Sequence, residues 1–97
     1  MLRVSNNPIA WVICRMPTVL RIGGLRVVIY PNDHRPAHVH VMGNGGEAVF
    51  KLHCPDGPPE LREIYGYDRT QANAIAQALE KELAALCADW SKWHGAY

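Results

Sequence analysis

The chain has 97 residues, of which 48% are apolar, and this is enough for the core of one small domain. Its formal net charge is +1, so overall charge gives no attraction for nucleic acid and any basic surface must be local. The three cysteines are widely spaced, which indicates neither a disulfide framework nor a zinc ribbon and favours a reducing, cytoplasmic location. No apolar run approaches the length of about 18 residues that a membrane span needs, so we expect no membrane partner.

The first fifteen residues contain a short apolar segment, residues 9–14, with only Arg3 as a basic residue before it. This segment is too short for a membrane helix, and no small-residue cleavage site follows it, so we do not expect a signal peptide. A more regular pattern begins at Met16. We therefore expect an N-terminal extension over residues 1–15, packed on the core or on a partner, and a single α+β domain over residues 16–97.

Four segments rich in β-branched and apolar residues predict strands, because such side chains suit a half-buried pleated surface. They span residues 18–22, 25–30, 37–42 and 47–53. Glycine pairs and runs at 23–24 and 43–46 are typical of tight turns, and the proline-containing stretches at 31–33 and 55–59 interrupt the strands. The sequence therefore predicts a four-stranded, mostly antiparallel meander.

The last third of the chain predicts one long helix. Residues 60–65 are expected to form a short helical turn, after which Asp68 is a good N-cap with Gln71 as capping-box partner and Tyr67 as hydrophobic staple. Apolar residues then recur at spacings of three and four over about six turns. They are Ala72, Ile75, Ala76, Leu79, Leu83, Leu86, Trp90 and Trp93. The pattern predicts a two-layer α+β domain with this C-terminal helix packed on one face of the sheet.

Alternation along the predicted strands separates two faces. The apolar set must meet the helix, since nothing else can bury it: Leu25, Val27, Ile29, Val39, Val41, Ala48, Phe50 and Leu52. One helix cannot also cover the other face, which we expect to be open to solvent or to a partner. That face collects basic and aromatic side chains: Arg21, Arg26, Tyr30, His38, His40, Lys51 and His53. The sequence therefore predicts a locally basic sheet face on a nearly neutral protein.

Three of the five histidines, His34, His38 and His40, lie within seven residues. His38 and His40 are on the same side of one strand, so both imidazoles can reach one metal ion, with His34 or His53 as a third ligand. His-x-His alone is a weak pattern, however, and Glu47 comes only after the glycine-rich turn, so no carboxylate follows closely. A metal site is the minority interpretation, and we expect no cofactor.

The same face fits RNA contact or cleavage. Side chains that can hold phosphates or stack a base are Arg21, Arg26, Tyr30, His34, Arg35 and Lys51. A histidine can serve as general acid or base toward a ribose 2′-hydroxyl, which makes His38 and His40 the candidate catalytic residues of a metal-independent ribonuclease. A purely structural role fits equally well, because His and Val alternate on half-exposed strands and Asp33 can cap the turn and bind His34.

Other residues of chemical interest are expected to have packing or surface roles: Cys54 and Cys87 inert, Trp90 and Trp93 in the core and at the helix end, and His53 and His94 at the surface. The sequence holds no P-loop, no paired-carboxylate motif and no Gly-x-Ser-x-Gly motif. These observations exclude the commonest hydrolase and nucleotide-binding patterns.

The run DHRPAHVHV at residues 33–41, with residues 16–26 and 46–48, resembles the small bacterial family catalogued as domain of unknown function 4160. Residues 61–67, the long helix and Trp90 look like the second half of the same family. The resemblance extends from Met16 to about Gly95 and leaves residues 1–15 outside. Ala37 stands where the family often has a second proline.

The resemblance implies one component of a two-gene bacterial operon, with a cognate small protein as its partner and a toxin–antitoxin-type role. On this basis we expect a toxin-like protein that binds or cleaves RNA through the His/Arg-rich open sheet face. The alternative is a non-catalytic interaction module that docks an acidic protein, or forms a homodimer, through the same face.

Overall fold

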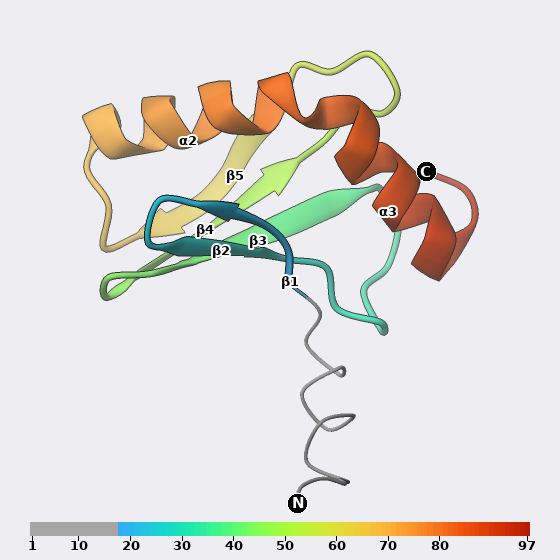
Figure 1. Cartoon of the computed structure of the whole chain (residues 1–97), viewed down its shortest axis with the longest axis horizontal. Coiled ribbons are helices and arrows are strands. Elements are labelled where there is room, and N and C mark those ends of the chain that lie inside the picture. The colour runs from blue at the N-terminus through green and yellow to red at the C-terminus, as the bar shows by residue number, and fades with distance from the viewer. Residues whose placement is uncertain (1–17) are drawn as a thin grey trace, which may run out of the picture.

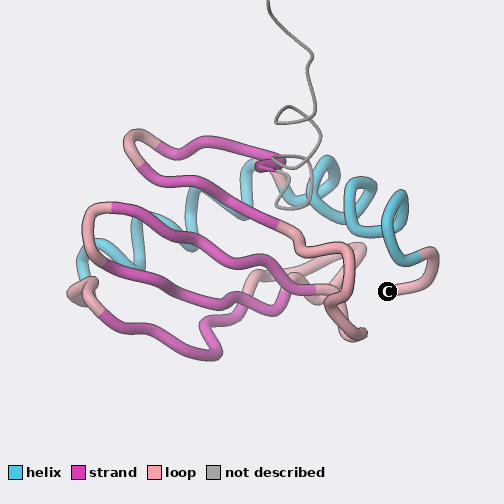
Figure 2. The backbone as a smooth tube through the Cα atoms, turned by 90° about the horizontal axis from the view of Figure 1, so that it is seen from below, coloured by secondary structure: helices cyan, strands magenta, loops and turns pink. Residues whose placement is uncertain are grey.

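A computed structural model describes residues 18–97, so the extension expected over residues 1–15 lies outside the described residues. Five strands form one antiparallel sheet in chain order, β1-β2-β3-β4-β5. They are β1 (Thr18–Ile22), β2 (Leu25–Val28), β3 (His38–Gly43), β4 (Gly46–Lys51) and β5 (Glu60–Tyr65). Two helices, α2 (Arg69–Lys81) and α3 (Leu83–His94), follow the sheet and cover one of its faces (Figure 1). Figure 2 shows the same two layers from the side of the sheet.

The α+β class and the antiparallel meander are confirmed, but the sheet has five strands rather than four. Residues 60–65, for which the sequence predicts a helical turn, form the edge strand β5. Its register against β4 runs from Lys51 opposite Glu60 to Glu47 opposite Tyr65. All six residues of β5 are exposed, so no alternation of buried and exposed side chains marks it as a strand. Backbone pairing with β4 decides its conformation.

Two helices, rather than one, carry the apolar stripe. The break lies at Glu82, whose φ of −109° and ψ of 16° leave the helical range, while its N–H bonds to the carbonyls of Leu79 and Glu80. Neither glycine nor proline occurs there, so the sequence pattern does not predict the break. The start of α2 is as expected, because Asp68 and Gln71 form a reciprocal capping box with bonds of 2.8 and 2.9 Å.

The hydrophobic core lies between the sheet and the helices and contains the apolar set that alternation predicts. Its fully buried large side chains include Ile29, Val39, Phe50, Leu79 and Trp90. Each such side chain contributes about 1.5–3 kcal/mol through removal from water. Trp93 is an exception among the predicted core residues, because it lies in the last turn of α3 and is 43% exposed.

Tyr67 fixes the turn between β3 and β4 to the start of α2. Its hydroxyl donates to the carbonyl oxygens of Gly43 at 2.8 Å and Gly46 at 3.0 Å. A Cβ atom on Gly46 would lie 2.6 Å from the Tyr67 ring, so only glycine fits beneath this side chain. This is a larger role than the hydrophobic staple that the sequence predicts for Tyr67.

A disulfide bond joins Cys54, in the loop after β4, to Cys87 in α3, with a Cα separation of 5.8 Å. The prediction that both cysteines are inert packing residues is therefore wrong. The two residues are 33 positions apart, and they meet only because α3 packs back over the end of the sheet. Cysteine spacing alone does not reveal such a bond.

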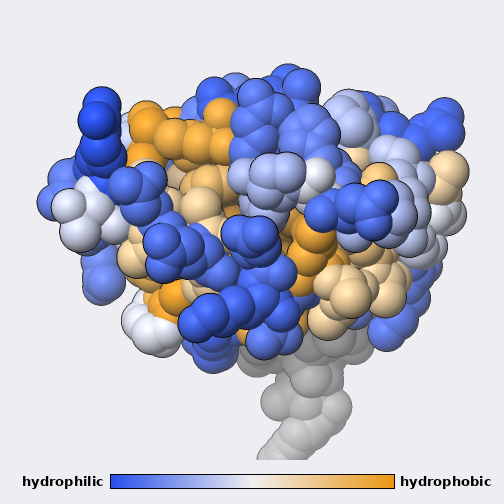
Figure 3. All heavy atoms as spheres, turned by 90° about the horizontal axis from the view of Figure 1, so that it is seen from above, coloured by the Kyte–Doolittle hydropathy of each residue, from blue (hydrophilic) through white to orange (hydrophobic). Residues whose placement is uncertain are grey.

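The outer surface of the helix layer is mostly hydrophilic, with some apolar atoms between the polar ones (Figure 3). Among the described residues, no helix combines the length and the hydropathy that crossing a membrane requires. The larger exposed apolar side chains include three from β5, namely Leu61, Ile64 and Tyr65.

Candidate functional site

The loop between β2 and β3 places a carboxylate on the sheet face that the helices leave uncovered, here called the helix-free face. The N–H of Tyr30 donates to Asp33 Oδ2 at 3.1 Å, and the N–H of Asp33 donates to the carbonyl of Tyr30, also at 3.1 Å. These reciprocal bonds form a tight turn immediately after β2. The turn returns the Asp33 side chain toward β3, where His38 and His40 lie.

Asp33, His38 and His40 form one compact group, here called the Asp–His–His centre. His38 Nε2 lies 3.5 Å from Asp33 Oδ1, and His40 Nε2 lies 3.3 Å from Asp33 Oδ2. One ligand-type atom from each residue lies within 4.8 Å of the others. Their side chains are only 11–17% exposed, so the centre is recessed below the surface.

His38 is held in a fixed orientation. Its Nδ1 donates to the carbonyl of Pro36 at 2.8 Å, because a carbonyl oxygen can only accept. This bond leaves Nε2 directed at Asp33. The ring also packs against Trp90 of α3, with the ring centroids 5.3 Å apart. The buried His38 thus presents one free nitrogen to the centre.

His40 lies two residues further along the same strand and has less support from hydrogen bonds. Its ring meets the edges of Tyr30 and His38, with centroid distances of 4.7 and 5.3 Å. Glu47 Oε2 is 3.7 Å from His40 Nδ1, beyond hydrogen-bonding distance. Both ring nitrogens are buried and have no hydrogen-bond partner of suitable geometry in the described part of the chain, although Asp33 lies close. Unsatisfied buried polar atoms of this kind are rare and often mark functional positions.

Helix α3 and the residues after it form one wall of the centre. The indole Nε1 of Trp90 donates to the carbonyl of Ala96 at 2.9 Å, and the ring of His94 stacks on Trp90 with centroids 4.1 Å apart. His94 Nε2 donates to the Tyr30 carbonyl at 3.1 Å. The prediction of a surface role for His94 is therefore wrong, since this residue ties α3 to the end of β2.

Tyr30 closes the centre from the other side. Burial, followed by the nearby carboxylates of Glu47 and Asp33, raises the pKa of the Tyr30 phenol above its ordinary value of 10.0. The hydroxyl is therefore neutral at physiological pH and can donate a hydrogen bond. Its ring packs on His40, which is a different contact from the base stacking that the sequence suggests.

Basic side chains border the centre on two sides. Arg21 and Arg26 are direct cross-strand neighbours on β1 and β2, and Lys51 is the cross-strand neighbour of His38. Among residues 18–97, none of these three cations has a carboxylate within salt-bridge distance. Two like charges directly opposite each other destabilise a sheet, so the arginine pair is suited to hold an anion.

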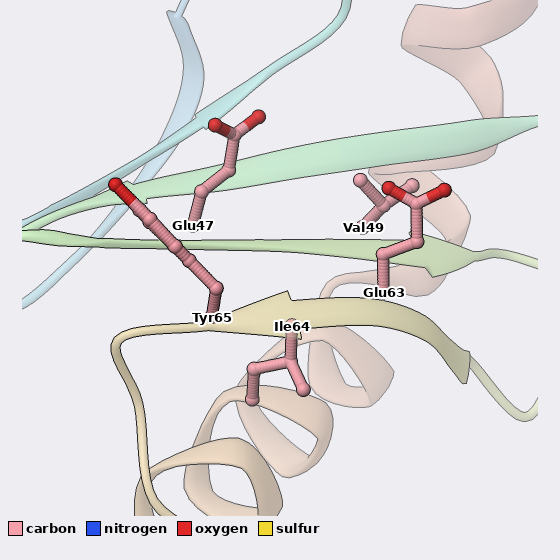
Figure 4. A pocket seen from close by; sticks show the side chains of 5 residues that line it. All are labelled: Glu47, Val49, Glu63, Ile64 and Tyr65. Carbon is pink, nitrogen blue, oxygen red and sulfur yellow. The ribbon is translucent and has the colours of Figure 1, made fainter.

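The helix-free face is less basic and less open than the sequence predicts. A hollow beside β4 and β5 is lined by Glu47, Val49, Glu63, Ile64 and Tyr65, and Figure 4 shows the two glutamates on the same side of the sheet. His40 also lies between its two cross-strand neighbours, Val28 of β2 and Val49 of β4, which are 0% and 8% exposed. The face therefore has a basic border, an acidic border and a buried middle.

Comparison with protein families identifies the chain. The model of DUF4160, described as a domain of unknown function, matches residues 24–91. The chain belongs to this family. The match runs from the turn before β2 into α3 and so includes the whole Asp–His–His centre. Neither the search of curated proteins nor the search of solved structures returned a significant match.

The DUF4160 fold brings some of the sequence-predicted site residues together and leaves others apart. His38 and His40 converge, with Arg26 and Lys51 on neighbouring strands. His34 and Arg35 are exposed in the loop before β3 and do not belong to the centre. His53 is exposed and pairs with Glu60 at 2.6 Å, and this hydrogen bond lowers the pKa of the Glu60 carboxyl.

Asp33 is the member of the centre that the sequence pattern does not reveal. It lies five residues before His38 in a loop, where the sequence suggests only a turn cap that binds His34. Its role depends on the return of the loop over β3, which periodicity does not describe. A carboxylate a few residues ahead of a His-x-His strand is the signal that points to it.

Proposed function

We propose that this DUF4160 domain is a toxin-like component of a bacterial toxin–antitoxin-type module that binds and cleaves RNA on its helix-free face. The observation that carries the proposal is the convergence of His38, His40 and Asp33 beside cations that have no salt bridge within residues 18–97. Two histidines beside one carboxylate are a suitable acid–base pair, and cations at the border can hold phosphates.

In the proposed reaction, one histidine takes the proton of a ribose 2′-hydroxyl as its oxygen attacks the adjacent phosphorus. The other histidine protonates the 5′-oxygen as the bond between phosphorus and that oxygen breaks. Arg26 and Lys51 stabilise the negative charge that builds on the phosphate oxygens. His38 contributes Nε2, because its Nδ1 is committed to the Pro36 carbonyl. This reaction needs no metal ion or cofactor.

The first test is growth inhibition. We expect expression of the wild-type chain in a bacterial host to slow growth, and expression of the His38→Ala/His40→Ala double variant to leave growth normal. His53→Ala is a matched control, because His53 lies outside the centre and is exposed. Circular dichroism must show that the double variant is folded. Continued inhibition by the folded double variant would contradict the catalytic assignment.

The second test is RNA binding by fluorescence anisotropy at several salt concentrations. Replacement of Arg26 by alanine should weaken binding about equally for all sequences and reduce the slope of log affinity against log salt by roughly 1. Arg69→Ala is the control, because Arg69 begins α2 in the helix layer. Equal losses in the two variants would show that RNA does not use the helix-free face.

The proposal includes a cytoplasmic location and a cognate small protein from the same operon as partner. The bond between Cys54 and Cys87 makes the location testable, because structural disulfides are rare in a reducing compartment. Rapid acid quenching of the cells, alkylation of the denatured protein and mass spectrometry should label both cysteines if the protein is cytoplasmic; denaturation is needed because Cys87 is buried. Protection of both cysteines would instead indicate an oxidising compartment.

The alternative is a non-catalytic interaction module. The distribution of charge favours a homodimer over an acidic partner, because Arg21 and Arg26 lie toward β1 while Glu47 and Glu63 lie toward β5. A two-fold axis through the face would bring opposite charges together. Light scattering after size-exclusion chromatography, on the full chain and on a chain that begins at Met16, tests this. A dimer lost on removal of residues 1–15 would support the alternative.

A further inference from the structure

We propose that Asp33, His38 and His40 bind one divalent transition-metal ion. The proposal concerns the same residues as the proposed function but does not depend on it, because metal binding is measured without RNA. Four features of the centre support a metal ion: the spacing of the side chains, the groups behind the histidine rings, the orientation of the His38 ring and the kind of ligand atom.

The spacing of the three side chains already fits a metal ion. Tetrahedral coordination with bonds of about 2.0–2.1 Å places neighbouring ligand atoms roughly 3.3–3.4 Å apart. The two contacts between histidine Nε2 and carboxylate oxygen measure 3.5 Å for His38 and 3.3 Å for His40. These two distances end on different oxygens of the Asp33 carboxylate. One ligand atom from each of the three residues nevertheless lies within 4.8 Å of the other two, so small side-chain rotations would bring three atoms onto one ion.

His38 has a hydrogen-bond partner on the ring nitrogen that faces away from the centre, because its Nδ1 is bonded to the Pro36 carbonyl at 2.8 Å. Metal-bound histidines almost always have such a carbonyl or carboxylate behind them, which fixes the tautomer and turns the free nitrogen toward the metal. Behind His40, Glu47 Oε2 lies 3.7 Å from Nδ1, so a carboxylate is near but not hydrogen-bonded.

The orientation of His38 directs one free ring nitrogen at Asp33. Because Nδ1 donates to the Pro36 carbonyl, Nε2 faces the Asp33 carboxylate at 3.5 Å. A metal ion between them would bind both groups, and it would also satisfy the buried Nε2 of His40, which has no hydrogen-bond partner among residues 18–97.

Two imidazoles and one carboxylate select the class of ion. Neutral imidazole suits Zn²⁺, Fe²⁺, Co²⁺ and Ni²⁺, whereas Mg²⁺ and Ca²⁺ prefer oxygen ligands. Three protein ligands also leave a position for water, as catalytic rather than structural zinc sites do. The centre is recessed, with side chains 11–17% exposed, so a bound ion would be largely shielded from bulk solvent.

Metal binding and the proposed metal-independent cleavage exclude each other, because both use the Nε2 atoms of His38 and His40. A bound ion would therefore inhibit that reaction. The sequence makes metal the minority interpretation because no carboxylate follows His-x-His, but the structure supplies one from the preceding loop.

The test is calorimetric titration of chelator-treated protein with Zn²⁺, together with visible absorption on addition of Co²⁺. A Cys14→Ser background removes the one cysteine outside the disulfide as a competing ligand. We expect one ion per chain and Co²⁺ bands typical of nitrogen and oxygen coordination. His40→Ala should weaken Zn²⁺ binding more than about 100-fold, since it removes a direct ligand.

Asp33→Asn is the second variant, because it keeps the shape of the carboxylate while removing its charge. It should weaken Zn²⁺ binding at least about 10-fold, whereas His53→Ala should leave affinity and stoichiometry unchanged. Absence of one-to-one Zn²⁺ binding, or equal affinity in the wild type and His40→Ala, would overturn the metal site.

RNA assays run in chelator and in Zn²⁺ separate the two proposals. Cleavage in chelator that Zn²⁺ suppresses supports both proposals. Zn²⁺ binding without RNA binding under either condition leaves the metal site standing and rejects the RNA function. RNA cleavage without Zn²⁺ binding would reject the metal site and support the RNA function.

Discussion

At the scale of single residues, Asp33 determines what His38 and His40 can do. Without it, the two imidazoles would be neighbours on a strand with no common partner. With it, each Nε2 has a carboxylate oxygen within 3.5 Å. The local turn made by Tyr30 and Asp33 is short and bonded at both ends, so the carboxylate is positioned before any ligand binds. Such preorganisation is what a metal or proton site requires.

Tyr67 carries a prediction at this scale. Tyr67→Phe keeps the ring over Gly46 but removes the one hydroxyl that bonds the Gly43 and Gly46 carbonyls, so we expect a loss of about 0.5–1.5 kcal/mol in the free energy of unfolding. Chemical denaturation at neutral pH measures this loss. An unchanged denaturation midpoint in the folded variant would show that water replaces the phenol without penalty.

Tyr67 also predicts a loss of folding stability at alkaline pH. Burial, with a further contribution from Glu47, raises the pKa of the Tyr67 phenol above 10.0. The folded state therefore favours the neutral phenol, so its contribution to stability is full below pH 10 and is lost as the pH rises through the raised pKa. Above about pH 10, wild-type stability should fall more steeply with pH than that of Tyr67→Phe. Parallel profiles would contradict this assignment.

At the scale of elements, the disulfide joins two parts of the fold that touch at one end of the sheet. It attaches the loop between β4 and β5 to α3, which also supplies Trp90 to the wall of the Asp–His–His centre. The same end of the sheet is tied by the bonds from His94 to Tyr30 and from Ala37 to the Tyr97 carbonyl. The position of α3 is therefore determined by several independent links.

Replacement of Cys54 by serine should lower the free energy of unfolding by about 2–4 kcal/mol, because the bond closes a long loop in the unfolded chain. Urea denaturation with and without reductant measures the loss, and the reduced wild type should match Cys54→Ser. Cys14→Ser is the control, because Cys14 takes no part in the bond. A loss of the same size in the control would mean that the disulfide contributes nothing specific.

At the scale of the whole molecule, we expect the backbone amides of the central strands to be better protected from hydrogen exchange than those of the edge strand β5. β3 and β4 have neighbours on both sides and contribute Val39, Val41 and Phe50 to the core, whereas β5 is exposed along its length. Regions with few buried contacts open at lower free energy than core strands. The backbone amides of β5 should therefore exchange before those of β3 and β4, in the middle of the sheet.

Hydrogen exchange followed by mass spectrometry tests this order on the full chain. Peptides from β3 and β4 should exchange at the rate of global unfolding, while peptides from β5 should exchange by local opening at least about 10-fold faster. Dilution to a concentration at which the chain is monomeric is the control for association. Slow exchange in β5 of the monomer would mean that pairing with β4 protects this edge as fully as the central strands.

The spacing of residues along the sequence was sufficient to predict much of the fold and part of the candidate site. The alternation of Val39 and Val41 with His38 and His40 correctly assigned one pair to the core and the other to the opposite face. The capping box at Asp68 also followed from residues three positions apart. These features depend on neighbours in the chain, which is why their spacing predicts them.

Short-range periodicity and motif were sufficient to predict the antiparallel meander up to β4, the buried apolar set and the family. Four features emerged only once the chain was folded: β5, the break at Glu82, the disulfide and the approach of Asp33 to the histidines. Each of these arises where segments distant in the chain, or an irregular loop and a strand, come into contact. The free energy of such contacts depends on distance in space, and no periodicity along the chain encodes that distance.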